Sequence, residues 1–292
     1  MDTLSFFKSG AATGNMQQKS GSKEKQAIYD LEEIVLIWAK QIFQATKTKE
    51  QSRLSQDCLQ FNINWSHVRF QFGTPIYEGI PRFGGGSLDR LTSGKVQPRL
   101  LYKAVFANRT DHKQEYTFKA ERISASICSV TTENGFSRGA NFAIKLKTPD
   151  DILAANAGFR RDILVCNFDE DTVEEELRWG VDSVVMVPPM TETTAELVMT
   201  EAQCTANFSM HIRFNGRVIV TVTDAKSNNA LVTIIEGNMA DIMQNEIAKG
   251  CKAFKLDKRT VVGEVRGSCK FRFGLEQKVT LTQKPLNSDK II

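Results

Sequence analysis

The sequence contains few of the residues, and none of the spacings, from which most catalytic sites are built. Only three histidines occur, His67, His112 and His211. No Walker loop, Rossmann glycine pattern, Gly-x-Ser-x-Gly elbow or His-Glu-x-x-His sequence is present. These absences remove the usual signatures of nucleotide-binding enzymes, serine hydrolases and metalloproteases. We therefore expect a protein that is not an enzyme and that carries no cofactor and no metal ion.

Cysteine pairs and long apolar runs are lacking as well. The six cysteines, at 58, 128, 166, 204, 251 and 269, form no Cys-x-x-Cys pair and are too sparse for a disulfide scaffold. We expect Cys204 to be a buried, reduced thiol. No stretch approaches the roughly 20 apolar residues of a membrane-spanning helix. Residues 1–25 lack the apolar core of a signal peptide, which favours a cytoplasmic or leaderless-secreted protein.

Charge of either sign is not in excess. The chain of 292 residues has 38 Lys and Arg against 34 Asp and Glu, a net charge of +4. Nucleic-acid-binding proteins cluster basic residues on one face, so no nucleic acid is expected as a partner. The acidic run from Asp169 to Glu176 lacks the Asp-x-Asp-x-Asp-Gly framework of a calcium loop, and a solvated face is the simpler interpretation.

The most informative pattern that is present lies between Glu201 and Thr223. Every even position from 202 to 222 is apolar or small, whereas the odd positions are nearly all polar. Side chains of a strand alternate between two faces, so this pattern predicts extended chain with one dry and one wet face. Because Asn-Gly favours a type I′ turn, Asn215-Gly216 predicts two strands, 202–214 and 217–223.

One long helix is predicted from Lys25 to Thr46. Its apolar residues recur at spacings of three and four: Ile28, Leu31, Val35, Trp38 and Ile42. We expect it to pack on the strand region 61–72 and to bury Leu31, Val35 and Trp38. An exposed helix that seeks a partner is the alternative. A shorter helix is predicted from an N-cap at Asn238 to Lys249, with Gly250 as its stop.

Alternating segments elsewhere predict further strands of a twisted, largely antiparallel sheet in which 101–130 and 195–223 run alongside each other. In the first of these segments the apolar phase changes between Ala120 and Ile123, which predicts a β-bulge. We expect a mainly β fold. Residues 1–24 would be a flexible tail, 25–100 a head with the long helix, and 101–292 a β region.

Short motifs in a fixed order carry a resemblance over roughly 100–286. They are Asn108-Arg-Thr after a strand, Gly135-Phe136 with Gly139, Val187-Pro188-Pro189, the long alternating strand with Asn215-Gly216, and Val265-Arg-Gly-Ser followed by Gly274, Val279-Thr-Leu and Lys284-Pro-Leu. In this order they resemble the aerolysin-like β-pore-forming proteins, in particular their epsilon-toxin branch.

The resemblance implies an elongated protein in which a segment between two long strands detaches and inserts into a membrane as an amphipathic hairpin. The matching segment here is 141–168. Its candidate membrane-insertion residues are Phe142, Ile144, Lys145, Leu146, Lys147, Ile152, Leu153, Ile163 and Val165. In the uninserted form this segment should lie on the long sheet as a hairpin or loop, with its apolar side chains covered.

Three functions remain open at this point. The first is a pore-forming or membrane-interacting protein that forms homo-oligomers and recognises membrane lipid or a cell-surface receptor, a glycan included. The second is a non-lytic binding or signalling protein on the same fold. The third is a carbohydrate-binding module, if the aromatic side chains of Trp65, Tyr77 and Trp179 are exposed for stacking on sugars.

Overall fold

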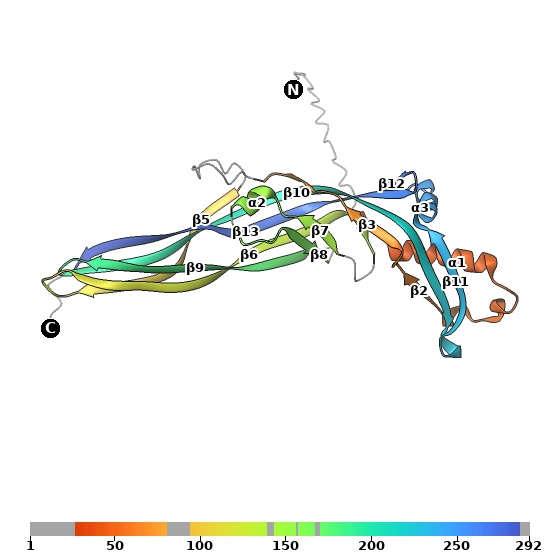
Figure 1. The fold of residues 1–292 in the computed structure, drawn as a ribbon, viewed down its shortest axis with the longest axis horizontal. Coiled ribbons are helices and arrows are strands. Elements are labelled where there is room, and N and C mark those ends of the chain that lie inside the picture. The colour runs from red at the N-terminus through yellow and green to blue at the C-terminus, as the bar shows by residue number, and fades with distance from the viewer. Residues whose placement is uncertain (1–26, 81–93, 139–142, 156, 167–169, 287–292) are drawn as a thin grey trace, which may run out of the picture.

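The computed structural model describes residues 27–80, 94–138, 143–155, 157–166 and 170–286. These residues form one large sheet of eleven strands and a separate sheet of two strands (Figure 1). The molecule is elongated and mainly β. The fold class predicted from the alternating segments and from the resemblance is therefore confirmed.

The large sheet contains β1 (Ala27–Asp30), β2 (Leu59–Asn64), β3 (Val68–Phe72), β4 (Ile76–Glu78), β5 (Gly94–Asn108), β6 (Gln114–Ser137), β9 (Asp171–Val187), β10 (Thr191–Asp224), β11 (Ala230–Asn238), β12 (Phe254–Asp257) and β13 (Thr260–Pro285). The small sheet contains β7 (Ile144–Lys147) and β8 (Asp162–Val165). The α-helices are α1 (Leu31–Thr46), α2 (Asp150–Ala154) and α3 (Met239–Ala248), and short 3-10 helices span Gln51–Arg53, Gln56–Cys58 and Ala225–Ser227.

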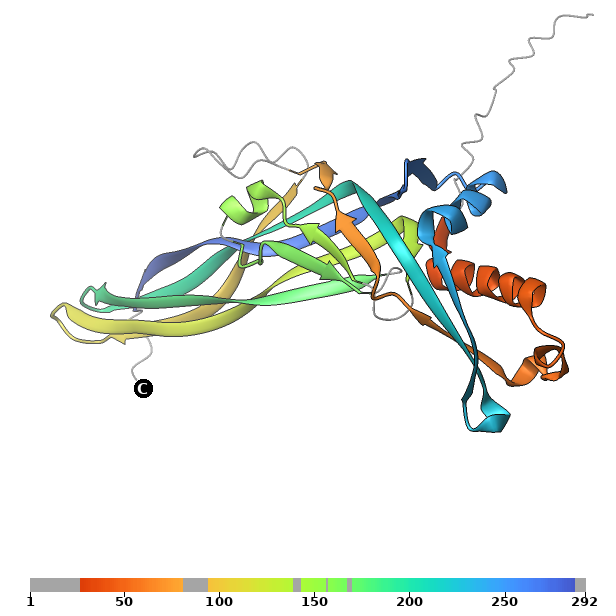
Figure 2. The same cartoon turned by 45° about the vertical axis from the view of Figure 1, so that its right-hand side comes forward.

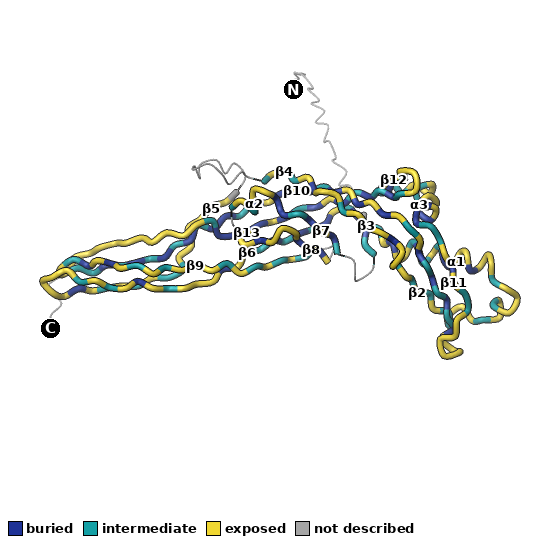
Figure 3. The backbone as a smooth tube through the Cα atoms, viewed as in Figure 1, coloured by how far each residue is buried: buried dark blue, intermediate teal, exposed yellow. Residues whose placement is uncertain are grey.

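The long strands run along the molecule toward one end, and α1, α3, β2 and β11 gather at the other (Figure 1). These long strands are β5, β6, β9, β10 and β13. We call residues 100–124, 177–200 and 275–285 the stem, residues 31–64 and 217–248 the head, and the sheet between them the body. The stem has its own apolar core of Phe118, Val185, Val187, Ala195 and Leu197. Body and head share a second, larger core (Figure 3).

Strand β10 connects all three parts. It is 34 residues long and passes through Asn215 and Gly216 without turning back, so the predicted hairpin at this dipeptide is wrong. Gly216 has φ +119°, and a Cβ atom there would lie 2.0 Å from the carbonyl oxygen of His67. At this point β10 exchanges β3 and β13 for β2 and β11 as its neighbours and bends from the body into the head (Figure 2). Gly216 thus allows β10 to bend here and lets the backbone of His67 approach closely.

Helix α1 covers the sheet of the head. It begins at Leu31 rather than at Lys25, because 27–30 pair with β6 as β1, and the Asp30 carboxylate accepts a hydrogen bond from the amide of Glu32 at 2.8 Å as the N-cap. Its buried residues are Leu31, Val35, Ala39 and Phe43. The ring of Phe43 meets that of Phe61 on β2 edge to face at 6.0 Å. Trp38 is half-buried and lies over Gly237 of β11. The predicted packing on the 61–72 region is realised at β2.

The sheet order explains how the predicted segments lie side by side. β5 pairs directly with β10, whereas β6 reaches β10 through β13. β6 pairs with β9 from Gln114 to Val130 without a register shift, so no bulge occurs in this pairing and that prediction is wrong. The inward positions after Ala120 are Ser124 and Ser126, both buried, while Ile123 is 56% exposed. The prediction took the apolar side chain of Ile123 as a sign of the buried face, and that assignment was wrong.

Helix α3 follows the prediction closely. The side chain of Asn238 accepts a hydrogen bond from the amide of Ala240 at 2.9 Å, and Gly250 has φ +104° just beyond the end of the helix. The predicted division of the chain at residue 100 stays a prediction, and residues 1–24 lie outside the part that the structure describes.

Candidate functional site

The segment singled out by the sequence folds as a small unit of its own. We call its described residues, 143–155 and 157–166, the insert. β7 and β8 pair antiparallel, with Ile144 opposite Val165 and Lys147 opposite Asp162, and α2 lies between them. This two-stranded sheet shares no ladder with the eleven-stranded sheet among the described residues. Figure 1 shows it lying along the body.

The structure places the apolar candidate residues on one covered face. Those that are buried, each at most 2% exposed, are Ile144, Leu146, Ile152, Ile163 and Val165. Leu153 and Lys147 are half-buried, and Lys145 is exposed. Phe142 lies outside the described residues. The run from Ile163 to Val165, which looks unfavourable for a two-faced arm, alternates in the structure because Leu164 points outward and is 48% exposed.

Two contacts of the insert were not predicted from the sequence. Phe159 packs edge to face on Phe271 of β13 at 5.7 Å and on Phe273 at 6.1 Å. Ala157 is buried in the same core. Between them Gly158 has φ +79°, and a Cβ atom there would lie 3.9 Å from the Cβ of Leu177 on β9. In the sequence, Gly158-Phe159 was the local signal for this tight turn and for the aromatic side chain that packs after it.

Polar contacts also hold the described part of the insert to the rest of the chain. The hydroxyl of Tyr77 on β4 donates to the carbonyl oxygen of Lys147 at 2.9 Å. The Arg160 guanidinium pairs with Glu175 of β9 at 2.8 Å, and the amide of Cys166 donates to Asp171 at 2.6 Å. Burial raises the pKa of Tyr77, so the phenol remains a hydrogen-bond donor at physiological pH. The contacts lie on both sides of α2.

Three thiols lie on the face of the body sheet that the insert covers. Cys128, Cys204 and Cys269 come from β6, β10 and β13 and are buried. Burial raises the pKa of Cys204 to about 11, and a hydrogen bond with Cys269 raises that of Cys128. All six cysteines are free, so the prediction for Cys204 holds. The raised pKa values keep Cys128 and Cys204 in the neutral thiol form.

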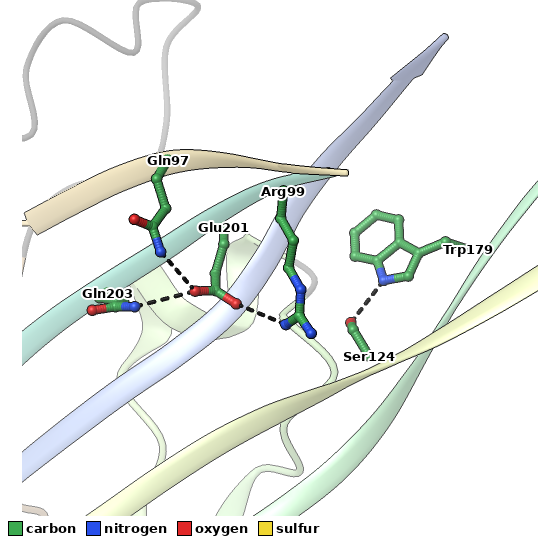
Figure 4. A network of polar contacts seen from close by, with 6 residues as sticks. All are labelled: Gln97, Arg99, Ser124, Trp179, Glu201 and Gln203. Carbon is green, nitrogen blue, oxygen red and sulfur yellow. Dashed lines mark hydrogen bonds and ion pairs between the residues drawn. The ribbon is translucent and has the colours of Figure 1, made fainter. Parts of the chain in front are cut away.

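A buried carboxylate marks the junction of body and stem (Figure 4). Glu201 is 5% exposed, accepts hydrogen bonds from Gln203 at 3.1 Å and Gln97 at 3.3 Å, and pairs with Arg99 at 3.3 Å. Burial by itself would raise the pKa of Glu201, but the two hydrogen bonds and the positive charges of Arg272 and Arg99 lower it below its usual range. The charge is therefore retained in the fold.

The aromatic side chains considered for sugar stacking are engaged within the protein. Trp179 is 8% exposed and donates to the Ser124 hydroxyl at 2.7 Å (Figure 4). Tyr77 is directed at the insert, and Trp65 is half-buried with the Arg138 guanidinium 5.6 Å from its ring. Trp179 is therefore closed to sugar stacking, and an intramolecular contact already engages each of the other two rings. The carbohydrate-binding alternative stays a prediction.

The acidic run does not converge on one point. Glu174 and Glu176 point outward from β9, whereas Glu175 points to the insert and binds Arg160. Among the described residues no group of three or more His, Cys, Asp or Glu side chains is placed to hold a metal ion. No helix in the described ranges is both long and apolar enough to cross a membrane.

Comparison with solved structures assigns the fold. A non-toxic crystal protein from Bacillus thuringiensis superposes with a TM-score of 0.52 at 15% identity, over 89% of this chain and 99% of that one. The chain has the aerolysin-like fold. The resemblance stated from the ordered motifs is thereby confirmed at the level of the fold. No protein-family model matches the sequence, and no curated protein matches it.

Two further solved structures are similar to this aerolysin-like chain at lower TM-scores. Parasporin-2, a Bacillus thuringiensis toxin that recognises cancer cells, has a TM-score of 0.42 at 16% identity, over 75% of this chain and 76% of that one. The β-pore-forming protein Mpp75Aa1.1 from Brevibacillus laterosporus has a TM-score of 0.39 at 14% identity, over 83% and 82%.

Proposed function

We propose that this aerolysin-like chain is a pore-forming protein that oligomerises at a membrane and inserts residues 141–168 as a β-hairpin. The observation that supports the proposal is the separateness of the insert. Its sheet has no ladder in common with the body among the described residues. The insert can therefore leave by giving up side-chain packing and a few polar contacts, while the ladders of the body stay intact.

The packing that is lost can be regained in lipid. Fully burying one Leu, Ile or Val side chain is worth about 1.5–3 kcal/mol, so the five buried side chains of the insert contribute about 10 kcal/mol to its docking. A bilayer core removes the same side chains from water. The exchange is then nearly neutral for Ile144, Leu146, Ile163 and Val165, and closure of a barrel satisfies the backbone.

The register of the insert suits two spanning arms. If the pairing of Ile144 with Val165 continued to a turn near 154–155, each arm would have about ten residues, close to the 9–11 that a tilted strand needs. Lys145 and Lys147 would then face an aqueous lumen. Helix α2 would have to unfold, which is a small cost because it has only five residues.

A disulfide tether tests the release of the insert. After replacement of the accessible cysteines 58, 166 and 251 by serine, Gly158→Cys and Leu177→Cys place two Cβ atoms 3.9 Å apart, a distance that a disulfide spans. The oxidised double variant should not release dye from liposomes, and reduction should restore release. Each single variant is the control, because Gly158→Cys alone strains the backbone.

Labels on neighbouring residues test the orientation in the membrane. An environment-sensitive dye on cysteines placed at 144 and 145 should report opposite polarity once the protein is bound, apolar for the first and aqueous for the second. If wild-type protein bound membranes but never released their contents, the lytic proposal would fall.

A second candidate is a non-lytic protein whose insert stays docked. Continued register places Asp150 and Arg161 on the lipid-facing side of the arms, and Pro149 lacks a ladder donor. The similar crystal protein is described as non-toxic, so the fold by itself does not require lysis. This candidate would be supported if the protein bound a membrane or a partner without releasing liposome contents. The amide hydrogens of the insert should then stay protected from exchange with solvent.

A further inference from the structure

Several cations on the outer face of the body and the adjoining stem pair with a carboxylate. Arg99 pairs with Glu201 at 3.3 Å and Lys103 pairs with Glu196 at 3.2 Å, each across neighbouring strands. Further toward the head, Arg266 pairs with Glu264 at 2.8 Å. This face is the one turned away from the insert. The charges of Arg99, Lys103 and Arg266 are thus neutralised within the fold.

Three other cations gather on this face without such a partner among the described residues. Lys95 of β5 and Lys270 and Arg272 of β13 line the same hollow of about 470 Å³. The register places Lys95 and Arg272 on either side of Gln203, and Lys270 lies two residues from Arg272 on the same face of β13. All three are exposed, and none forms an ion pair with a carboxylate of the described residues.

The nearby carboxylates do not neutralise this group. Glu201 feels the charge of Arg272 but is engaged by Arg99, Gln97 and Gln203. Glu174 lies on the same rung beyond Ile127, two strand spacings or about 10 Å from Arg272. Three like charges around one hollow repel each other, so their arrangement is stabilised when an anion enters.

We propose that this hollow, which we call the 95/270/272 site, binds a phosphate group. A planar guanidinium can bind two phosphate oxygens at once, and two ammonium groups supply further charge. The hydroxyl of Thr205, which also lines the hollow, is an additional donor. The Ser129 hydroxyl lies 3.1 Å from that of Thr172 and can donate to the phosphate when it accepts from Thr172. Three cations in one hollow match a single phosphate and not a nucleic-acid backbone, which needs a series of contacts.

The site is independent of the proposed insertion. Phe271 and Phe273 alternate with Lys270 and Arg272 along β13 and point to the opposite face, where Phe159 of the insert packs on them. The 95/270/272 site is therefore open while the insert is docked. A phosphate there is either free in solution or part of a lipid headgroup, and two probes distinguish these sources.

The test compares two double variants of the full chain that lose the same charge from the same strand. Lys270→Gln with Arg272→Gln removes two cations of the site, and Lys278→Gln with Lys284→Gln removes two exposed cations of the stem. Binding of inorganic phosphate is measured by calorimetry. Binding to vesicles of phosphatidylcholine, with and without phosphatidic acid, is measured by sedimentation, and melting curves confirm that both variants fold.

Each cation near an anionic surface contributes about 1 kcal/mol, so losing two should weaken binding of phosphatidic-acid vesicles about thirtyfold. The stem variant should bind as the wild type does. Binding of free phosphate with the same selectivity assigns the site to phosphate in solution, and binding only to phosphatidic-acid vesicles assigns it to a headgroup; both support the proposal. Equal weakening by the two double variants, or no binding of either probe, would overturn it.

Discussion

At the scale of single residues, the junction of body and stem depends on a glycine that makes room for a tryptophan. A Cβ atom at Gly274 would lie 2.2 Å from the ring of Trp179. The indole N–H of this ring donates a hydrogen bond to the Ser124 hydroxyl. We expect Gly274→Ala to displace the ring and lower the free energy of unfolding by about 1–3 kcal/mol through overpacking.

Gly180, next to Trp179, provides the matched control for this substitution. A Cβ atom there would meet nothing within 4 Å. Gly180→Ala should therefore leave the denaturation midpoint nearly unchanged. Equal destabilisation by both substitutions in urea unfolding would contradict the account of Gly274.

The carboxylate of Glu201 should make stability at this junction depend on acid. Its pKa is lowered in the fold, so its contribution is complete above the ordinary glutamate value of about 4.3 and is lost as the pH falls through the lower folded value. Glu201→Gln should then cost about 1–3 kcal/mol at pH 7 and progressively less below about pH 4.

Urea unfolding of wild type and variant at several pH values checks this expectation. Glu174→Gln, on the exposed face of β9, is the control and should change stability little at any pH. A loss for Glu201→Gln that stayed constant down to strongly acidic pH would show that the charge of Glu201 does not stabilise the fold.

At the scale of elements, helix α1 has a covered side and an open side. Trp38 lies over Gly237, whereas Ile37, one position earlier, is 45% exposed. Trp38→Ala should lower the free energy of unfolding by about 3 kcal/mol, the lower end for a tryptophan because the ring is half-buried. Ile37→Ala should cost less than about 1 kcal/mol. A melting curve of Trp38→Ala that matched wild type would favour an exposed, partner-seeking helix.

Pairing between elements explains why the insert is separable and the other segments are not. β10 pairs with β13 through almost all of the body and the stem. Detaching either strand would therefore break a long ladder of backbone hydrogen bonds. β7 and β8 satisfy only each other. The insert therefore has the fewest backbone ties to the rest of the fold of any paired segment described here.

At the scale of the whole molecule, the long strands should dominate the solution shape. A compact protein of 292 residues would have a radius of gyration of about 19 Å. We expect small-angle scattering to give a clearly larger radius and an elongated distance distribution, because stem, body and head follow one another along β10 (Figure 1). A radius near the compact value would contradict the extended arrangement.

The alternation of residues 202–222 was enough to show that this stretch is extended and has one apolar and one polar face. The face on which each side chain lies depends only on the two-residue period of a strand. The same holds for the insert, whose Ile144, Leu146, Ile163 and Val165 are covered as expected, and for the caps of α3, which are local hydrogen bonds. The order of short motifs was enough to identify the fold.

Only the tertiary structure decided what each strand lies against. Gly216 looked like a turn because Asn-Gly is favourable in isolation, but a neighbouring strand at His67 and Val68 needs the same glycine for close approach. Ser124 and Ser126 face inward because the phase of β6 is set by its pairing with β9, not by their polarity. Lys95 lies 175 positions or more from Lys270 and Arg272 in the sequence, and only the register of β5, β10 and β13 brings it beside them. Local chemistry sets the period and the caps, whereas contacts between distant segments set the partners.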